Sequence, residues 1–226
     1  MADEEEFEDA YYGTDDPTDF TFSKTQVKLL SYTIGSVLET IDCPITISDR
    51  LSWGKVRIHF SAGSLDVINR QEQVDFCNGD FERYGTIAVV RGESAILRSD
   101  VPNHLSRTIE MHEKVVSIDY INETISEPAN RNMPDYSVSW TQAIVFHLEN
   151  SVVVVGKEAW FSEMVAVNIG KSEVGLLYDD SVNFDDDDAT RPVIVTTERF
   201  HVEREPAFDS RDMPPDGFGE EPGDRK

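Results

Sequence analysis

The sequence predicts an α+β fold in which one N-terminal helix packs on a mainly antiparallel β-sheet or β-sandwich of about nine short strands, with acidic disordered tails. Three observations support this fold class: a single segment with helical apolar spacing, a series of short β-branched segments separated by turn residues, and acids concentrated near the chain ends. The 39% apolar and 10% aromatic content supplies a core, since disordered chains lack aromatic and β-branched residues. We therefore predict acidic flexible tails at residues 1–21 and 204–226 and one globular domain at residues 22–203.

The predicted helix spans residues 24–41. Ser23 is a suitable N-cap, and Gln26 three residues later completes a capping-box pattern. Pro44 predicts the end of the helix, because proline disfavours helical geometry in the residue before it. The apolar residues recur at helical spacing and form one stripe: Val27, Leu30, Ile34, Val37, Leu38 and Ile41.

Strand signals follow the helix at hairpin distances. No connection long enough for a helix lies between the segments, so the pairing should be mainly antiparallel. The longest segment, residues 108–121, is expected to bend or change sheets near residues 112–114. The predicted strands are residues 55–60, 65–69, 86–90, 95–98, 108–121, 143–148, 152–155, 164–169, 174–178 and 193–202.

The formal net charge of −24 is concentrated in three segments. Residues 1–20 hold nine acids and no base, residues 179–188 hold six acids and no base, and residues 203–226 hold eight acids against four bases. The other 172 residues carry only −5. Charge at such density stays solvated and attracts cationic partners, while it is repelled by anionic lipids and by nucleic-acid phosphates. We therefore predict a nearly neutral domain with acidic appendages and neither a nucleic-acid nor a membrane partner.

Cysteine usage and hydropathy bear on the compartment. Cys43 and Cys77 match no metal-ligand spacing, which favours two reduced thiols over a disulfide. No stretch approaches the roughly 18 apolar residues of a membrane span. The N-terminus has acids where a signal peptide has bases. The sequence therefore predicts a cytoplasmic protein.

The run Asp185, Asp186, Asp187 and Asp188 is a candidate cation or docking site, because hard cations bind several carboxylate oxygens. On an EF-hand template that starts at Asn183, Asp188 stands where glycine is required and Ile194 where a bidentate glutamate is required. The template therefore fails. Three alternatives remain: a solvated hairpin loop, a weak Ca²⁺ or Mg²⁺ site, and a docking loop.

Three histidines lie in strand-like contexts, at His59, His147 and His201. Each is expected on the strand face opposite its apolar neighbours, and on adjacent strands their imidazoles would converge on a transition metal. Histidine on a half-exposed strand is the commoner situation, so no metal ligand is predicted.

The remaining catalytic motifs are incomplete. His112 and Glu113 begin like a zincin helix motif, but Val116 stands where the second histidine is required. The sequence contains no Gly-x-Ser-x-Gly elbow and no glycine-rich phosphate-binding loop. We therefore predict no catalytic residue and no cofactor.

Trp160 and Phe161 are the most informative aromatic pair. Two large rings on a short segment ahead of a predicted strand can anchor a binding surface. The alternative is that they plug one end of the sheet core, and the same two interpretations apply to Trp53 and Trp140.

These observations favour a non-enzymatic acidic binding or inhibitory module that docks a basic protein partner. The predicted binding residues are Trp160 and Phe161 together with the run from Asp185 to Asp188. Single-sign surfaces raise association rates with targets of opposite charge and lose that advantage in salt. One alternative is a soluble domain of unknown role whose acid excess is an adaptation to a high-salt cytoplasm. The other is a metal-dependent enzyme that uses the histidines or the aspartate run.

Overall fold

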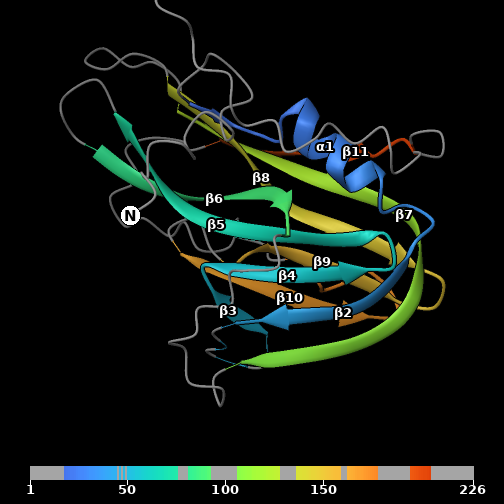
Figure 1. The fold of residues 1–226 in the computed structure, drawn as a ribbon. Helices are drawn as coiled ribbons and strands as arrows, with labels where there is room; N and C mark the ends of the chain where they lie inside the picture. The colour runs from blue at the N-terminus through green and yellow to red at the C-terminus, as the bar shows by residue number, and fades with distance from the viewer. Residues whose placement is uncertain are drawn as a thin grey trace, which may run out of the picture.

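A computed structural model of the chain describes residues 18–44, 46, 48, 50–75, 81–92, 106–127, 136–158, 162–177 and 194–204. Within these residues it contains one helix and eleven strands (Figure 1). The predicted combination of one helix with a mainly antiparallel sheet is confirmed, but the strands number eleven rather than about nine. The elements are β1 (Asp19–Phe20), α1 (Lys24–Ser31), β2 (Val37–Cys43), β3 (Leu51–Trp53), β4 (Lys55–Phe60), β5 (Gly63–Asp75), β6 (Phe81–Arg91), β7 (Arg107–Glu127), β8 (Tyr136–Leu148), β9 (Val152–Lys157), β10 (Met164–Gly170) and β11 (Ile194–His201).

The helix begins where the sequence predicted it and ends ten residues earlier. The Ser23 hydroxyl accepts a hydrogen bond from the Gln26 amide at 3.3 Å, so the predicted N-cap is present. After Ser31 the chain makes tight turns, in which the Thr33 amide donates to the Leu30 carbonyl at 3.0 Å, and Gly35 then adopts φ +88°, a conformation that suits glycine. The prediction of helix through residue 41 is therefore wrong.

The second half of the predicted helix is β2, and a β-bulge explains the error. Leu38 pairs with Phe60 and Thr40 with His59, so Glu39 is an extra residue in the strand. The bulge shifts the inward face by one position, and the buried residues become Leu38, Ile41 and Cys43. The three-residue step from Leu38 to Ile41 imitates helical spacing, which is why the apolar pattern alone was misleading.

The strands form one hydrogen-bonded path in the order β3-β10-β9-β8-β7-β2-β4-β5-β6, with β1 on β8 and β11 on β7. Only the β1–β8 pair is parallel among the described strands. Only Gly54, with φ +70°, separates β3 from β4 in the chain. The strand order that starts at β3 and continues through β10 therefore comes back to β4, which follows β3 directly in the chain after the bend at Gly54.

Strand β7 joins the two halves of this path. Its first residues, 107–114, pair with β2, and its later residues pair with β8 on one side and β11 on the other. At the transition His112 has φ +57°, and Val116 is bulged out between two β8 pairs. Figure 1 shows β7 curving around one side of the molecule. The predicted bend near residues 112–114 is therefore confirmed.

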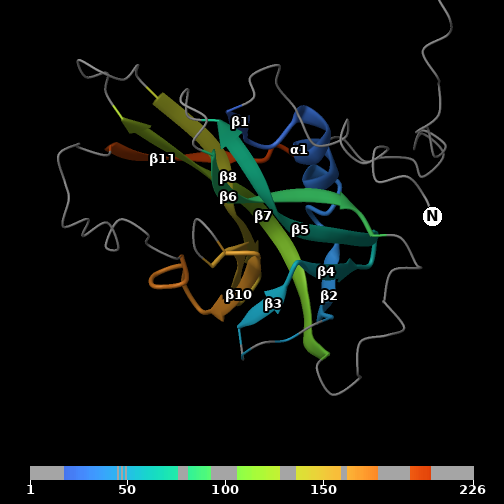
Figure 2. The same cartoon turned by 90° about the vertical axis from the view of Figure 1, so that its left-hand side faces the viewer.

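The main core cluster draws residues from both halves of the path and from the helix. Leu30 of α1, Ile58 of β4, Ile118 of β7 and Phe146 of β8 are fully buried in it. A second cluster contains Trp140, which stacks on Tyr84 with ring centroids 5.3 Å apart. In Figures 1 and 2, α1 lies at one end of the molecule and β3 at the other. Trp140 is thus a core residue, the second of its two predicted alternatives.

Two of the four predicted hairpins are present. Strand β4 pairs with β5, and β8 pairs with β9. The predicted strand at 86–90 lies within β6 but pairs with β5, and residues 95–98 lie outside the described residues. Residues 174–177 form a turn instead of the predicted strand, because Gly175 has φ +74° and the Leu176 amide donates to the Glu173 carbonyl at 2.9 Å.

Two residues of the segment predicted as the N-terminal tail, Asp19 and Phe20, form β1 and pair with Ser139 and Trp140 of β8. No helix among the described residues is long and apolar enough to cross a membrane.

The positive φ of His112 gives a test of the β7 bend. We expect His112→Val to lower the free energy of unfolding by roughly 1–2 kcal/mol, because a β-branched side chain clashes with its own backbone in this region. His112→Gly and His112→Asn should stay within about 0.5 kcal/mol of the parent. The exposed ion pair between His112 and Glu110 contributes little to this difference. Urea denaturation measures all three variants, and an equal loss in all three would assign the effect to the imidazole instead.

Candidate functional site

Two of the three predicted strand histidines converge on one carboxylate. Asp119 of β7 contacts His201 Nδ1 through one oxygen at 2.8 Å and His147 Nε2 through the other at 3.2 Å. The pairing of β7 with both β8 and β11 causes this, because it places Asp119 directly opposite His201 and near His147. Arg199 donates to the same carboxylate at 3.0 Å and also forms an ion pair with Glu173.

The Asp119 carboxylate is held in its ionised form. Burial alone would raise its pKa, but hydrogen bonds from His201, Arg199 and His147 outweigh burial and lower the pKa below its usual value. Each imidazole directs a nitrogen at a carboxylate oxygen rather than at a shared point. Among the described residues no group of three or more His, Cys, Asp or Glu has an arrangement that could hold a metal ion.

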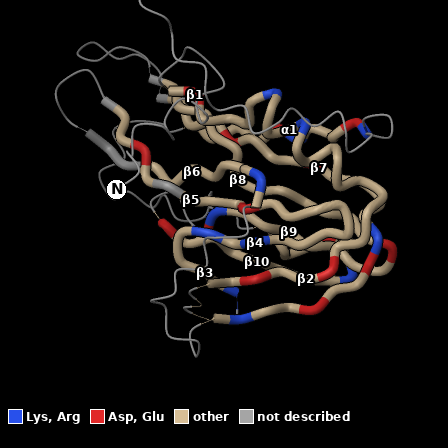
Figure 3. Tube along the Cα trace, in the orientation of Figure 1, with Lys and Arg blue, Asp and Glu red and all other residues tan. Residues whose placement is uncertain are grey.

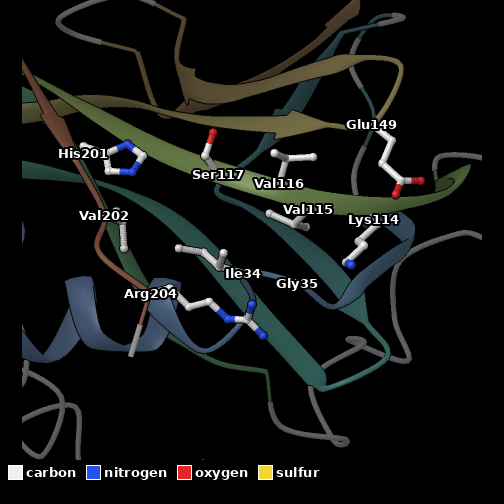
Figure 4. Close-up of a pocket in the computed structure, with 10 residues that line it drawn as sticks. All are labelled: Ile34, Gly35, Lys114, Val115, Val116, Ser117, Glu149, His201, Val202 and Arg204. Carbon is white, nitrogen blue, oxygen red and sulfur yellow. The ribbon is translucent and has the colours of Figure 1, made fainter. Parts of the chain in front are cut away.

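His201 also lines a pocket of about 300 Å³ (Figure 4). The pocket lies where β7 leaves β2 and gains β11. The Gly35 amide donates to the Val115 carbonyl at 2.9 Å, and the Val202 amide donates to the Ile118 carbonyl at 2.9 Å. The segments that belong to β2 and β11 do not meet along this edge of β7, and the break between them leaves an opening. Its lining is Ile34, Gly35, Lys114, Val115, Val116, Ser117, Glu149, His201, Val202 and Arg204.

A third polar group lies on the outer face of β2, β4 and β5. His59 Nε2 lies 2.8 Å from Asp42 Oδ2, and His59 Nδ1 lies 2.9 Å from Ser64 Oγ. Thr108 donates to the other Asp42 oxygen at 2.6 Å. His59 therefore lies apart from the other two histidines, and it forms a hydroxyl–imidazole–carboxylate chain that no sequence motif indicated.

Trp53 is 46% exposed, and it lies at the end of the β9–β10 ladder opposite the turn that contains the pocket residue Glu149. It pairs with Met164 of β10, and the Gly54 amide donates to the Glu163 carbonyl at 3.0 Å. Buried Asn69 fixes this corner, since its amide nitrogen donates to the carbonyls of Ser162 at 2.9 Å and Met164 at 2.8 Å.

The predicted binding residues themselves lie outside the described residues. This holds for Trp160, Phe161, Asp185, Asp186, Asp187 and Asp188, and for Cys77. The described residues that directly follow Phe161 are those held beside Trp53. Cys43 is a buried free thiol, and burial, opposed by the charge of Arg107, raises its pKa to about 11. It is therefore protonated at neutral pH.

Sequence reasoning missed the pocket and both histidine–carboxylate groups. Their residues come from separate strands, and only the strand order brings them together. The one usable signal was the alternation that placed each histidine on the outward strand face.

Comparison of the chain with protein-family models, with curated proteins and with solved structures finds no match in any of the three.

The Asp119 cluster predicts a pH-dependent contribution to stability. We expect Asp119→Asn to lower the free energy of unfolding at pH 7 by about 1–3 kcal/mol, because it weakens charge-assisted hydrogen bonds to three partners. A carboxylate whose folded pKa is lowered stabilises the fold above its unfolded value near 3.9, and this contribution is lost as the pH falls through the folded pKa.

The difference between parent and variant should therefore shrink below about pH 4. Guanidinium denaturation at several pH values measures it. A difference that stays constant down to pH 2 would show that the charge of Asp119 contributes nothing.

Proposed function

We propose that this protein is a non-enzymatic binding module that docks a basic protein partner, with its acid excess steering the approach. The observation that carries the proposal is the division of charge. The described residues hold 18 acids against 14 lysines and arginines, a net charge of −4, so −20 of the total −24 belongs to residues outside them. In Figure 3 the described part carries charges of both signs.

This division supports binding over a role of the acids in holding the fold. The core and the sheet ladder consist of described residues whose charges nearly balance. An excess of negative charge accelerates the encounter with a basic surface, whatever the positions of the acids in the chain. The alternative of salt adaptation requires acid over the scaffold surface as well, which the near balance of the described residues disfavours.

Trp53 is the anchor that we propose for the partner. A tryptophan that is 46% exposed on a three-residue strand at the end of the sheet path leaves much apolar area in water. Large aromatic side chains dominate interface energetics, so an exposed one on a rigid corner suits recognition. The chain that follows Trp160 and Phe161 is held beside it by Asn69. We include these two residues and the run from Asp185 to Asp188 in the proposed binding surface.

The Ser64–His59–Asp42 chain is the strongest argument for an enzyme, and its surroundings favour a structural role. Serine hydrolysis requires hydrogen-bond donors, commonly backbone amides, aimed at the developing oxyanion. Ser64 lies on β5, which is paired with β4 on one side and β6 on the other, and its carbonyl accepts from Gly92. Amides within a ladder lie in the sheet plane and are already engaged. Asp42, His59 and Ser64 therefore link three strands on the outer face.

The anchor is tested by affinity capture from a cell extract at low and high salt. We expect a basic protein to be retained at low salt and released by about 0.5 M NaCl, because screening removes the steering charge. Trp53→Ala should weaken retention of that protein by about 30-fold or more, the loss typical of an interface hot spot.

Val174→Ala is the matched control, since Val174 is apolar and 89% exposed but lies away from Trp53. Equal effects of both substitutions, or capture that does not depend on salt, would contradict the proposed surface.

The non-enzymatic part of the proposal has its own test. We expect a fluorophosphonate probe to leave Ser64 unmodified, because no engaged ladder amide can stabilise the oxyanion of the attack. Peptide mapping by mass spectrometry locates any adduct. Modification at Ser64 that disappears in the His59→Gln variant would establish a reactive serine and overturn this part.

A further inference from the structure

We propose that the opening between β2 and β11, where Lys114, Arg204 and His201 line a pocket with Val115, Val116 and Val202, binds a small molecule that carries one carboxylate on an apolar stem. This site is independent of the Trp53 surface. The two lie at opposite ends of β9 and β10, because Met164 pairs with Trp53 at one end and Gly170 pairs with Val152, next to the Glu149 turn, at the other.

The first argument is the sign of the lining charges. Three cationic or titratable bases and one acid line the pocket of a chain in which 44 acids face 20 lysines and arginines. Neither Lys114 nor Arg204 has a carboxylate within ion-pair distance in the described part of the chain. Unpaired cations gathered at one opening of an acidic protein supply what an anionic group requires.

The second argument is the placement of Arg204 and His201. A Cβ at position 35 would lie 2.9 Å from Arg204 Nη2, so the guanidinium rests directly on the backbone of Gly35. Figure 4 shows Arg204 extending toward Gly35. His201 Nδ1 contacts Asp119 at 2.8 Å, an interaction that orients the ring and does not use Nε2. The Arg204 guanidinium can donate two N–H groups to an oxyanion, and the oriented His201 ring donates through Nε2 in the form that carries protons on both nitrogens.

The third argument is the apolar wall. Val115 and Val202 are buried beside the opening, while Val116 is 57% exposed because it is the bulged residue of β7. A volume of about 300 Å³ corresponds to roughly ten water molecules. The pocket therefore accommodates a stem of a few carbon atoms.

Glu149 selects the charge of the ligand. Its carboxylate belongs to the same lining, and in Figure 4 it lies on the Lys114 side of the opening. A second negative charge on the ligand would be repelled by it. The pocket is thus suited to a monoanion such as an aliphatic carboxylate and poorly suited to a phosphate dianion.

The test uses sodium hexanoate, neutral hexanol and inorganic phosphate as probes, with amide chemical shifts of the full-length protein as the readout. We expect saturable shifts at Gly35, Val115 and Ser117 with hexanoate, at a dissociation constant of about 0.1–1 mM. Hexanol and phosphate should bind at least about tenfold more weakly, since hexanol lacks the carboxylate and phosphate lacks the apolar stem.

Arg204→Gln should weaken hexanoate binding by about tenfold or more, the loss expected for a charge-assisted hydrogen bond. Lys171→Gln is the matched control, because it removes one exposed positive charge outside the pocket and should leave hexanoate binding unchanged.

Equal chemical-shift changes with hexanol would show that the site is only an apolar crevice. Equal binding of phosphate would show that the site does not select a monoanion. Unchanged hexanoate binding by the Arg204→Gln variant would show that the carboxylate binds elsewhere. Each of these results overturns the proposal. None of them bears on capture of a basic protein through Trp53, so the two proposals fail separately.

Discussion

The structure depends on one strand that serves both halves of the sheet. Strand β7 is 21 residues long, and its ladder partner on one edge changes from β2 to β11 near Val115. A strand of this length cannot stay straight beside two differently directed sets of neighbours, because twist accumulates along it. The left-handed residue His112 and the bulge at Val116 absorb the bend. The pocket and the Asp119 cluster both lie beside this bend, so the same constraint that shapes the sheet creates the opening in it.

The charge of the protein acts at two separate scales. Over the whole chain the acid excess attracts cations at long range, whereas some charges of the described scaffold have specific partners. Arg57 and Asp66 show this local matching, since they pair across β4 and β5 at 2.6 Å with both side chains buried. Lys114 and Arg204 have no such carboxylate partner among the described residues, and both line the pocket. Their position at the β7 bend is consistent with retention of cations for a ligand rather than for the fold.

The sequence predicted the strand-rich class, the helix start and the bend in β7, because each rests on a local signal. Ser23 caps the helix through its own hydroxyl, and the β-branched run of residues 108–121 is long enough to require a change of partner. The prediction of the helix end was wrong for an equally local reason, because the bulge at Glu39 gives the buried residues of β2 a three-residue spacing. The strand order was not accessible. Nothing within Phe146-His147-Leu148 or Phe200-His201-Val202 indicates that β7 lies between them with Asp119.

The distance between Trp53 and the pocket has a mechanical consequence for a binding protein. The β9–β10 ladder, whose register comprises six residue pairs, lies between the two sites: β10 begins beside Trp53, and the ladder ends near the turn that contains the pocket residue Glu149. A packed ladder does not deform continuously, so a small ligand at one end transmits little to the other unless a second register exists. The valine-rich β9 is buried along its whole length, with Val153 and Val155 in the main core cluster and Val152 and Val154 in a separate one, so a change of register would require both clusters to repack. The geometry therefore favours two sites on one rigid scaffold that act without coupling.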